Sequence, residues 1–229
     1  MFHRILIIAL LLTTPLGLPL LPAMAQDEQV WDEDLNRFLT PQEMGQEDVY
    51  LTPEDAAKLM FPESDHIRSE VITITEDQKR LIVERIGWHF PESTFDCFIG
   101  ETKGTIDGWA FIQHTIGKHK PMTYMVGVAP DGEVTNVEIL VYRESRGSEV
   151  RKKRFNYQYQ GKTVDDPIRI NRDLINISGA TMSVRSMSAG VKRALVLADE
   201  LYLKSQSKNA AINTASRTDK ALWESLLGF

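Results

Sequence analysis

The strongest periodic pattern of apolar and polar residues lies near the C-terminal end of the chain. After residue 180, apolar residues recur every three or four positions, at Val184, Met187, Val191, Leu195, Ala198 and Leu201. This spacing predicts an amphipathic α-helix that extends to about Lys204 and buries one stripe of side chains. Its long polar residues fall largely on the remaining face, where we expect them to contact water: Arg185, Lys192, Arg193 and Glu200.

A different pattern precedes this helix. Four segments rich in aromatic and β-branched residues predict strands over 95–100, 108–115, 122–128 and 133–142. Asp131-Gly132 separates the last two segments, and this pair is typical of the turn in a β-hairpin. Strands with flanking helices predict an α+β fold, in which a small antiparallel or mixed sheet packs against helices.

Shorter signals predict helices before the first of these strands. Thr52-Pro53 has the residues of a helix start, and that helix is expected to end near Met60. Thr75 and Gln78 have the spacing of a capping box, which predicts a second helix that ends at Gly87. Two further elements complete the pattern, a strand over 71–74 and a helix over 150–160.

The first residues have the pattern of an export signal. Arg4 precedes an apolar run over 5–21, and Ala23-Met24-Ala25 has the small residues of a cleavage site. We therefore expect cleavage after Ala25 and a periplasmic mature protein. The rest divides into an acidic arm with short helices over 26–92, a folded domain over 93–204, and a linker with a short amphipathic tail over 205–229.

Composition narrows the classes of protein that the chain can represent. It has 229 residues, 42% of them hydrophobic and 25% charged, which is ordinary for a globular protein. The net charge of −6 argues against nucleic-acid binding, which needs a basic surface. The run Arg151-Lys152-Lys153-Arg154 is consistent with a solvated helix face or with a docking patch. Cys97 is the single cysteine, so an internal disulfide is excluded, and its apolar neighbours predict a buried strand position.

Several possible chemical motifs fail on their context. Gly161-Lys162-Thr163 matches the end of a phosphate-binding P-loop, but Asn156 occupies the place of the required earlier glycine. His114 and His119 lack a second pair of closely spaced ligands, so we expect no metal site. The sequence contains no Cys-x-x-Cys-His segment, which excludes a c-type haem attached through that motif.

The start of the long helix is the best candidate for a binding site. Ser178 is placed to cap the helix, and Gly179 can adopt the positive φ of a tight turn. A helix N-terminus presents free N–H groups that suit an anion such as phosphate, and Thr181 adds a hydroxyl there. The same pattern is also consistent with a capped core helix that binds nothing.

The run Ser178-Gly179-Ala180-Thr181-Met182-Ser183 resembles the flavinylation motif of the FMN-binding domain family. This family includes the flavin-carrying subunits of sodium-pumping NADH:quinone reductase and of Rnf complexes. The resemblance covers about residues 97–204 and includes four further blocks: Gly117–Pro121, Val126–Val128 with Asp131-Gly132, Tyr142–Gly147 and Gly161–Thr163. It implies that a flavin transferase esterifies Thr181 with the phosphate of FMN.

The resemblance also implies roles for residues outside the motif. It places Lys162 in the recurring core of the domain, where its charge would lie near the phosphate or a flavin carbonyl; alternatively it is a surface lysine. Glu144 and Gly147 match a loop that lies close to the cofactor, although a simple turn after a strand is an equal alternative. Many family members have an acidic residue three places before the motif serine, where this chain has Ile175, and Asp173 stands two residues earlier.

Taken as a family resemblance, these residues imply an exported flavoprotein that carries covalent FMN. Such a protein relays electrons between a membrane redox complex and another carrier or reductase, for example a cytochrome, and needs no catalytic residue or metal of its own. Two alternatives remain open at this point. The domain could be a docking or assembly module in which flavin is absent or only structural, or a flavin reductase with a diffusible substrate.

Overall fold

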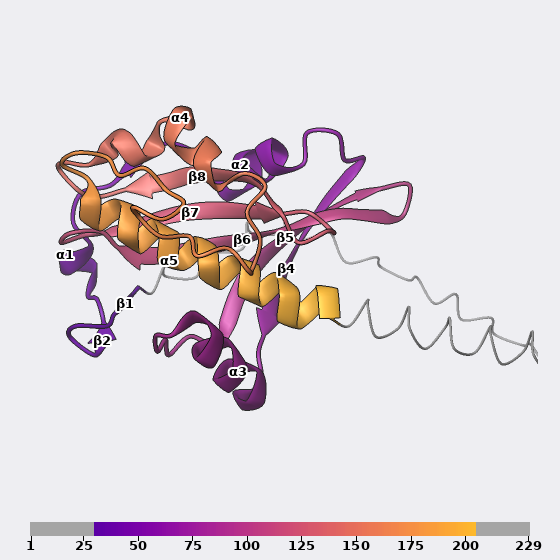
Figure 1. The fold of residues 1–229 in the computed structure, drawn as a ribbon, viewed down its shortest axis with the longest axis horizontal. Coiled ribbons are helices and arrows are strands. Elements are labelled where there is room, and N and C mark those ends of the chain that lie inside the picture. Colours follow the sequence, from indigo (N-terminus) through magenta and orange to yellow (C-terminus); the bar gives the residue numbers. More distant parts are fainter. Residues whose placement is uncertain (1–29, 205–229) are drawn as a thin grey trace, which may run out of the picture.

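The computed structural model describes residues 30–204 of the chain. Over these residues the fold is α+β, as predicted, and it is built on a six-stranded antiparallel sheet (Figure 1). The strand order is β3-β8-β7-β6-β5-β4, so β3 and β4 form the two edges. The strands are β3 Asp48–Val49, β4 His66–Thr73, β5 Thr94–Thr102, β6 Thr105–Ile116, β7 Pro121–Val128 and β8 Val134–Tyr142.

Side chains alternate between the two faces of this sheet, as the period of a strand requires. In β6, Trp109 and Phe111 belong to the core cluster under α5 (Thr181–Ala198), whereas Ala110 and Ile112 pack with α2 (Pro53–Met60) on the other face. Helices therefore cover both faces of the sheet. This explains why β7 is buried along its whole length and β6 along its middle part.

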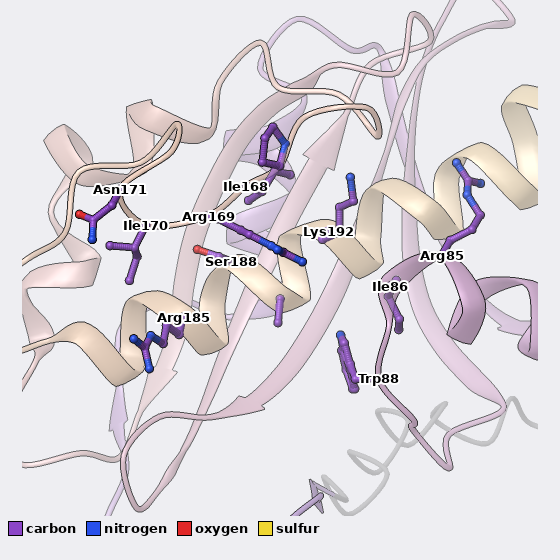
Figure 2. Close-up of a pocket in the computed structure, with 12 residues that line it drawn as sticks. Arg85, Ile86, Trp88, Ile168, Arg169, Ile170, Asn171, Arg185, Ser188 and Lys192 are labelled. Carbon is purple, nitrogen blue, oxygen red and sulfur yellow. The ribbon is translucent and has the colours of Figure 1, made fainter.

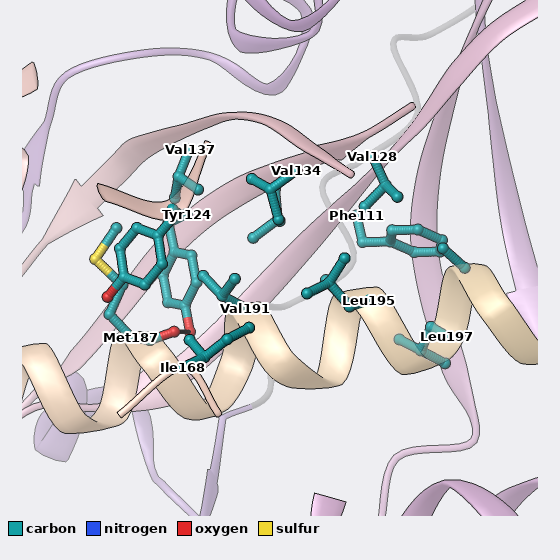
Figure 3. Packing of buried hydrophobic residues seen from close by; sticks show 14 of the residues in the cluster. Phe111, Tyr124, Val128, Val134, Val137, Ile168, Met187, Val191, Leu195 and Leu197 are labelled. Atoms are coloured by element: carbon teal, nitrogen blue, oxygen red, sulfur yellow. Dashed lines mark hydrogen bonds between the residues drawn. The ribbon is translucent and has the colours of Figure 1, made fainter. Parts of the chain in front are cut away.

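The larger part of the core lies between the sheet and α5. Figure 3 shows Phe111 and Tyr124 of the sheet facing the apolar stripe of α5, which includes Met187, Val191 and Leu195. The stripe predicted from the sequence is therefore confirmed. The helix continues as a π-helical turn, Asp199–Leu203, and its last part packs near α3 (Glu76–Ile86).

The predicted helix starts and the predicted hairpin are also confirmed. Thr52 Oγ1 accepts a hydrogen bond from Asp55 N–H at 3.1 Å, and α2 begins at Pro53. Thr75 and Gln78 form both bonds of a capping box at the start of α3, which ends at a left-handed Gly87. β7 and β8 pair as a hairpin around the Asp131-Gly132 turn.

The acidic arm contains regular elements besides α2 and α3: β1 Trp31–Asp32, β2 Arg37–Phe38, α1 Pro41–Met44 and β3, which pairs with β8. One expectation about secondary structure is wrong in part. The segment 150–160 is not one helix but three short turns: η1 Ser148–Arg151, α4 Lys153–Asn156 and η2 Tyr157–Tyr159. The extended backbone of Lys152 interrupts it, and the basic run 151–154 is exposed, as a solvated face would be.

Arg193 contradicts the expectation that it contacts water. Only 2% of it is exposed, and its guanidinium lies 5.0 Å from the Trp88 ring centre and 5.5 Å from those of Phe90 and Phe95. Its Nε donates to Gln113 Oε1 at 2.6 Å. Aromatic rings from the distant segment 88–95 thus stabilise a charge at a position that the helix pattern assigns to solvent.

The other polar residues of this helix differ in exposure. Arg185 is exposed as expected, but Lys192 and Glu200 are only partly exposed because they bond to groups of their own chain. Cys97 is buried in β5, which confirms its predicted position. Within residues 30–204, no helix is both long and apolar enough to cross a membrane. The expected export signal and the tail after Lys204 lie outside the described residues.

Candidate functional site

The candidate site begins at the N-terminus of α5, where no side chain caps the helix. The helix starts at Thr181, its N-cap residue is Ala180, and the cap position makes no side-chain hydrogen bond. Ser178 is exposed and does not cap the helix, so that expectation is wrong. Gly179 has a φ of +84°, as expected, and this turn places Ala180 rather than the serine at the cap.

The missing cap leaves main-chain donors available at this point. The first main-chain bond of the helix runs from Val184 N–H to Ala180 C=O at 2.9 Å. The N–H groups of the three residues before Val184, at 181–183, therefore lack partners within the helix. Such a group of donors, together with the positive end of the helix dipole, suits the oxygens of a phosphate.

Thr181 holds its hydroxyl at this helix start and is half-buried. Asn176 Nδ2 donates to Thr181 Oγ1 at 2.8 Å, while Asn176 Oδ1 accepts from Ile177 N–H at 2.9 Å. The asparagine is therefore fixed at both ends and orients the threonine oxygen. Sequence reasoning missed Asn176, because an asparagine five residues before the threonine fits no general capping pattern.

Ser183 and Gly147 lie beneath the helix start. Ser183 is only 3% exposed, and its Oγ is 3.4 Å from the hydroxyl of Tyr142, which donates to Arg146 C=O at 2.7 Å. Gly147 has a φ of +87°, and a Cβ there would lie 2.8 Å from Tyr142 Oη and 3.0 Å from Ser183 Oγ. Because Gly147 has no side chain, the loop after β8 can approach the motif closely. This loop then packs against the first turn of α5.

Glu144 serves a neighbouring loop. Its Oε1 accepts hydrogen bonds from the N–H groups of Lys120, at 2.9 Å, and of His119. The carboxylate therefore ties the end of β8 to the loop between β6 and β7. The structure accordingly brings three of the implied blocks, 117–121, 142–147 and 178–183, into contact or near contact.

Lys162 is paired with an acid of its own chain. Its Nζ lies 3.0 Å from Asp173 Oδ2, and the same carboxylate accepts from Ile168 N–H at 3.0 Å and Arg169 N–H at 2.7 Å. Partial burial opposes ionisation of Asp173, but the hydrogen bonds from the Arg169 N–H and Lys162 outweigh it and lower the pKa of this carboxyl. Lys162 and Asp173 thus fix the loop that precedes the motif.

Two hollows lie on either side of the exposed face of α5. The hairpin groove, about 580 Å³, is named for the β1–β2 hairpin and lined by Trp31–Leu35, Trp88, Glu92, His114–His119, Met182, Ser186, Ala189 and Arg193. The basic groove, about 430 Å³, is lined by Arg85, Ile86, Trp88, Pro167–Asn171, Arg185, Ser188, Ala189 and Lys192 (Figure 2). Trp88 and Ala189 line both grooves, so the two grooves adjoin each other at these residues.

These features fit a flavin mononucleotide better than they fit a metal. Among the described residues, no group of three or more potential metal-ligating side chains occurs, and His114 and His119 belong to the wall of the hairpin groove. The uncapped helix start offers N–H donors to a phosphate. The hairpin groove adjoins it through Met182 and has a volume within the range of cofactor sites, which is about 300–1,000 Å³.

Comparison with known proteins identifies the domain. Residues 117–196 match the family model of the FMN-binding domain, and this range contains the whole Ser178–Ser183 motif. A search of curated proteins finds no match.

The chain is also similar to two solved structures. The crystal structure of Shewanella oneidensis NqrC shares 13% identity, covers 66% of this chain and 88% of its own, and has a TM-score of 0.47. That of a Na⁺-translocating NADH-quinone reductase subunit from Parabacteroides distasonis shares 13% identity, with 58% and 76% covered and a TM-score of 0.41. The family model confirms the resemblance that the motif residues indicate, since residues 117–196 match the FMN-binding domain.

Proposed function

We propose that this protein is an exported flavoprotein whose FMN is attached by a phosphoester to Thr181. In this role it relays electrons between a membrane-bound redox complex and a second carrier or reductase, such as a cytochrome. Attachment would keep the cofactor on a protein that has no access to a cytoplasmic pool of FMN. The export pattern of residues 1–25 and the FMN-binding domain over 117–196 both support this proposal.

One observation carries the assignment of the attachment residue. Thr181 is the first residue of an uncapped 18-residue helix, and its hydroxyl oxygen accepts a bond from Asn176 at 2.8 Å. Ser183, the other motif residue with a hydroxyl inside the helix, is 3% exposed and faces Tyr142. A flavin transferase can therefore reach Thr181 more readily than Ser183.

Each part of the site has a distinct task in this proposal. The flavin supplies one- and two-electron chemistry, and the protein supplies attachment, orientation and electrostatics. The N–H groups at the start of α5 would stabilise the remaining phosphate charge by about 0.3–1 kcal/mol, and more where the site is partly buried. The hairpin groove would receive the ring beside Met182, with Trp31 and Trp88 in its walls to exclude water.

The experiment is a mass measurement on protein made with a flavin transferase and exported. We expect an FMN-sized increment on the parent chain, and its loss in Thr181→Ala and Thr181→Val, which both remove the hydroxyl. Ser178→Ala is the matched control inside the motif, because Ser178 is exposed and caps nothing. It should keep the full increment.

Two results would contradict the proposal in different ways. An unchanged increment in Thr181→Ala would move the attachment to another residue. A parent chain without any increment, made beside a positive control substrate of the transferase, would instead favour a docking or assembly module without covalent flavin. A yellow colour that survives acid precipitation is the rapid form of the same measurement.

A further inference from the structure

The basic groove concentrates positive charge in a protein that is acidic as a whole. Four of its lining residues are cationic, Arg85, Arg169, Arg185 and Lys192, and its lining includes no Asp or Glu. The full chain carries a net charge of −6, so this grouping runs against the overall balance. In Figure 2, Ile168 to Asn171 lie along one side of α5 and Trp88 lies on the other, so the groove spans the exposed face of the helix.

Two of the four cations are fixed by their own chain. Arg85 Nη1 lies 2.6 Å from Asp199 Oδ2 and 2.5 Å from Glu200 Oε1. Lys192 Nζ donates to the carbonyl oxygens of Asp166, at 2.8 Å, and of Val164. These contacts hold the two side chains in place at one end of the groove.

The other two cations are available to a ligand. Arg169 and Arg185 are exposed, and neither makes an ion pair with any residue in the described range 30–204. A guanidinium presents parallel N–H donors that match the two oxygens of a carboxylate or phosphate. The two groups come from different elements, Arg169 from a loop and Arg185 from α5, and both line the basic groove.

The cations also repel one another. Burial lowers the pKa of Lys192, and the nearby charges of Arg85 and Arg169 lower it further, against the opposing effect of Asp165 and Asp166. An anion placed among these side chains would relieve that repulsion.

The rest of the lining favours a small molecule over a broad protein surface. Trp88, Ile86 and Ile170 supply apolar walls, while Asn171 supplies an amide. A hollow of about 430 Å³ that combines some apolar wall with charged and polar groups lies within the size range of small-molecule sites. An acidic protein surface would need no such hollow.

We propose that the basic groove is a binding site for a small multivalent oxyanion, either a di- or tricarboxylate or a molecule that carries a diphosphate. The groove adjoins the hairpin groove along the exposed face of α5, and Trp88 and Ala189 line both. This site does not depend on the proposed flavin attachment, so it can be tested on full-length chain that has never met a flavin transferase.

The test is calorimetric titration of the unmodified chain with citrate and, separately, with pyrophosphate, in a low-salt buffer without other polyvalent anions. We expect at least one of them to bind, and added salt to weaken it. Arg169→Gln and Arg185→Gln should each weaken binding about tenfold, the loss expected for one charge-assisted hydrogen bond. Arg154→Gln is the matched control, since it removes one exposed cation from outside the groove.

Each outcome decides a point. Binding of citrate alone would assign a polycarboxylate ligand, and binding of pyrophosphate alone a diphosphate; both support the site. No binding of either at millimolar concentration would overturn it, as would equal weakening by Arg154→Gln. A poly-glutamate peptide that binds while both small anions fail would also overturn it, and would assign the groove to an acidic protein partner. Unchanged circular dichroism of each variant keeps the comparison valid.

Discussion

The contact between α5 and the sheet can be tested at a single glycine. Gly190 lies in the middle of α5, and a Cβ built on it would come within 1.8 Å of Tyr124 Oη and 2.9 Å of Tyr124 Cζ. Tyr124 lies in β7 and is fully buried, and its hydroxyl is 3.2 Å from Thr115 Oγ1 and 3.3 Å from Met187 C=O. The ring therefore has little freedom to move away from an added methyl group.

Gly190→Ala sets two effects against each other. Alanine in place of glycine inside a helix stabilises the fold by about 1 kcal/mol. Overpacking of a filled core costs about 1–3 kcal/mol, and displacing a buried hydroxyl from its partners costs about 1–3 kcal/mol more. We expect the second effect to win, with a net loss of about 2 kcal/mol and a fall in melting temperature of about 4–8 °C.

Urea unfolding of four proteins measures this balance: the parent, Gly190→Ala, Tyr124→Phe and the double variant. Because Tyr124→Phe removes the oxygen that the new methyl group meets first, the double variant should lose less free energy of unfolding than the two single losses combined. If Gly190→Ala is as stable as the parent or more so, helix propensity dominates and the close approach of α5 to β7 is not a rigid constraint. Equal urea midpoints for the two proteins are the refuting result.

Two other positions give sharp expectations. In urea titrations, Gly147→Ala should lower the free energy of unfolding by about 1–3 kcal/mol more than Gly179→Ala does. Both glycines have positive φ, but only Gly147 has atoms within 3.0 Å of the added Cβ. Equal losses in the two variants would show that the loop around Gly147 moves to accommodate the methyl group. Cys97 should resist alkylation at pH 8 in the folded protein, since burial raises the pKa of its thiol from 9.0 to about 12. The folded form thus holds this proton more tightly than the unfolded form, so its contribution to the free energy of unfolding is complete below pH 9 and is lost as the pH rises through about 12. Intact mass after treatment with iodoacetamide at pH 8 measures the reaction, and rapid alkylation of the folded protein would contradict this expectation.

Local signals in the sequence predicted the helix starts, the hairpin turn and the buried face of α5. Capping residues such as Thr52 and Thr75, the turn at Asp131-Gly132 and the stripe along α5 act over a few residues, so their physical effect can be read from neighbours in the chain. The two-residue strand β3 could not be predicted in this way. It exists because a distant partner, β8, supplies its hydrogen bonds.

The candidate site was predictable only where one segment builds it. Thr181 at the start of α5 follows from the local pattern, although Ala180 rather than Ser178 occupies the cap, because the turn at Gly179 shifts the start of the helix by two residues toward the C-terminus. The buried state of Arg193 was not predictable, because the rings that surround it come from another part of the chain. The two grooves are formed by segments that lie more than a hundred residues apart in the chain, so no periodic pattern in the sequence predicts them.

The position of β4 at the edge of the sheet has a consequence for how the protein behaves in concentrated solution. Among the described residues β4 pairs only with β5, so one row of its main-chain donors and acceptors is open to another strand. Arg68 stands on this edge between Glu70 and Glu101, with contacts of 2.7 and 2.9 Å. Charged side chains on a bare edge oppose the addition of a strand from a second molecule. Neutralising these side chains should therefore increase self-association and lower solubility, without a change at the distant start of α5.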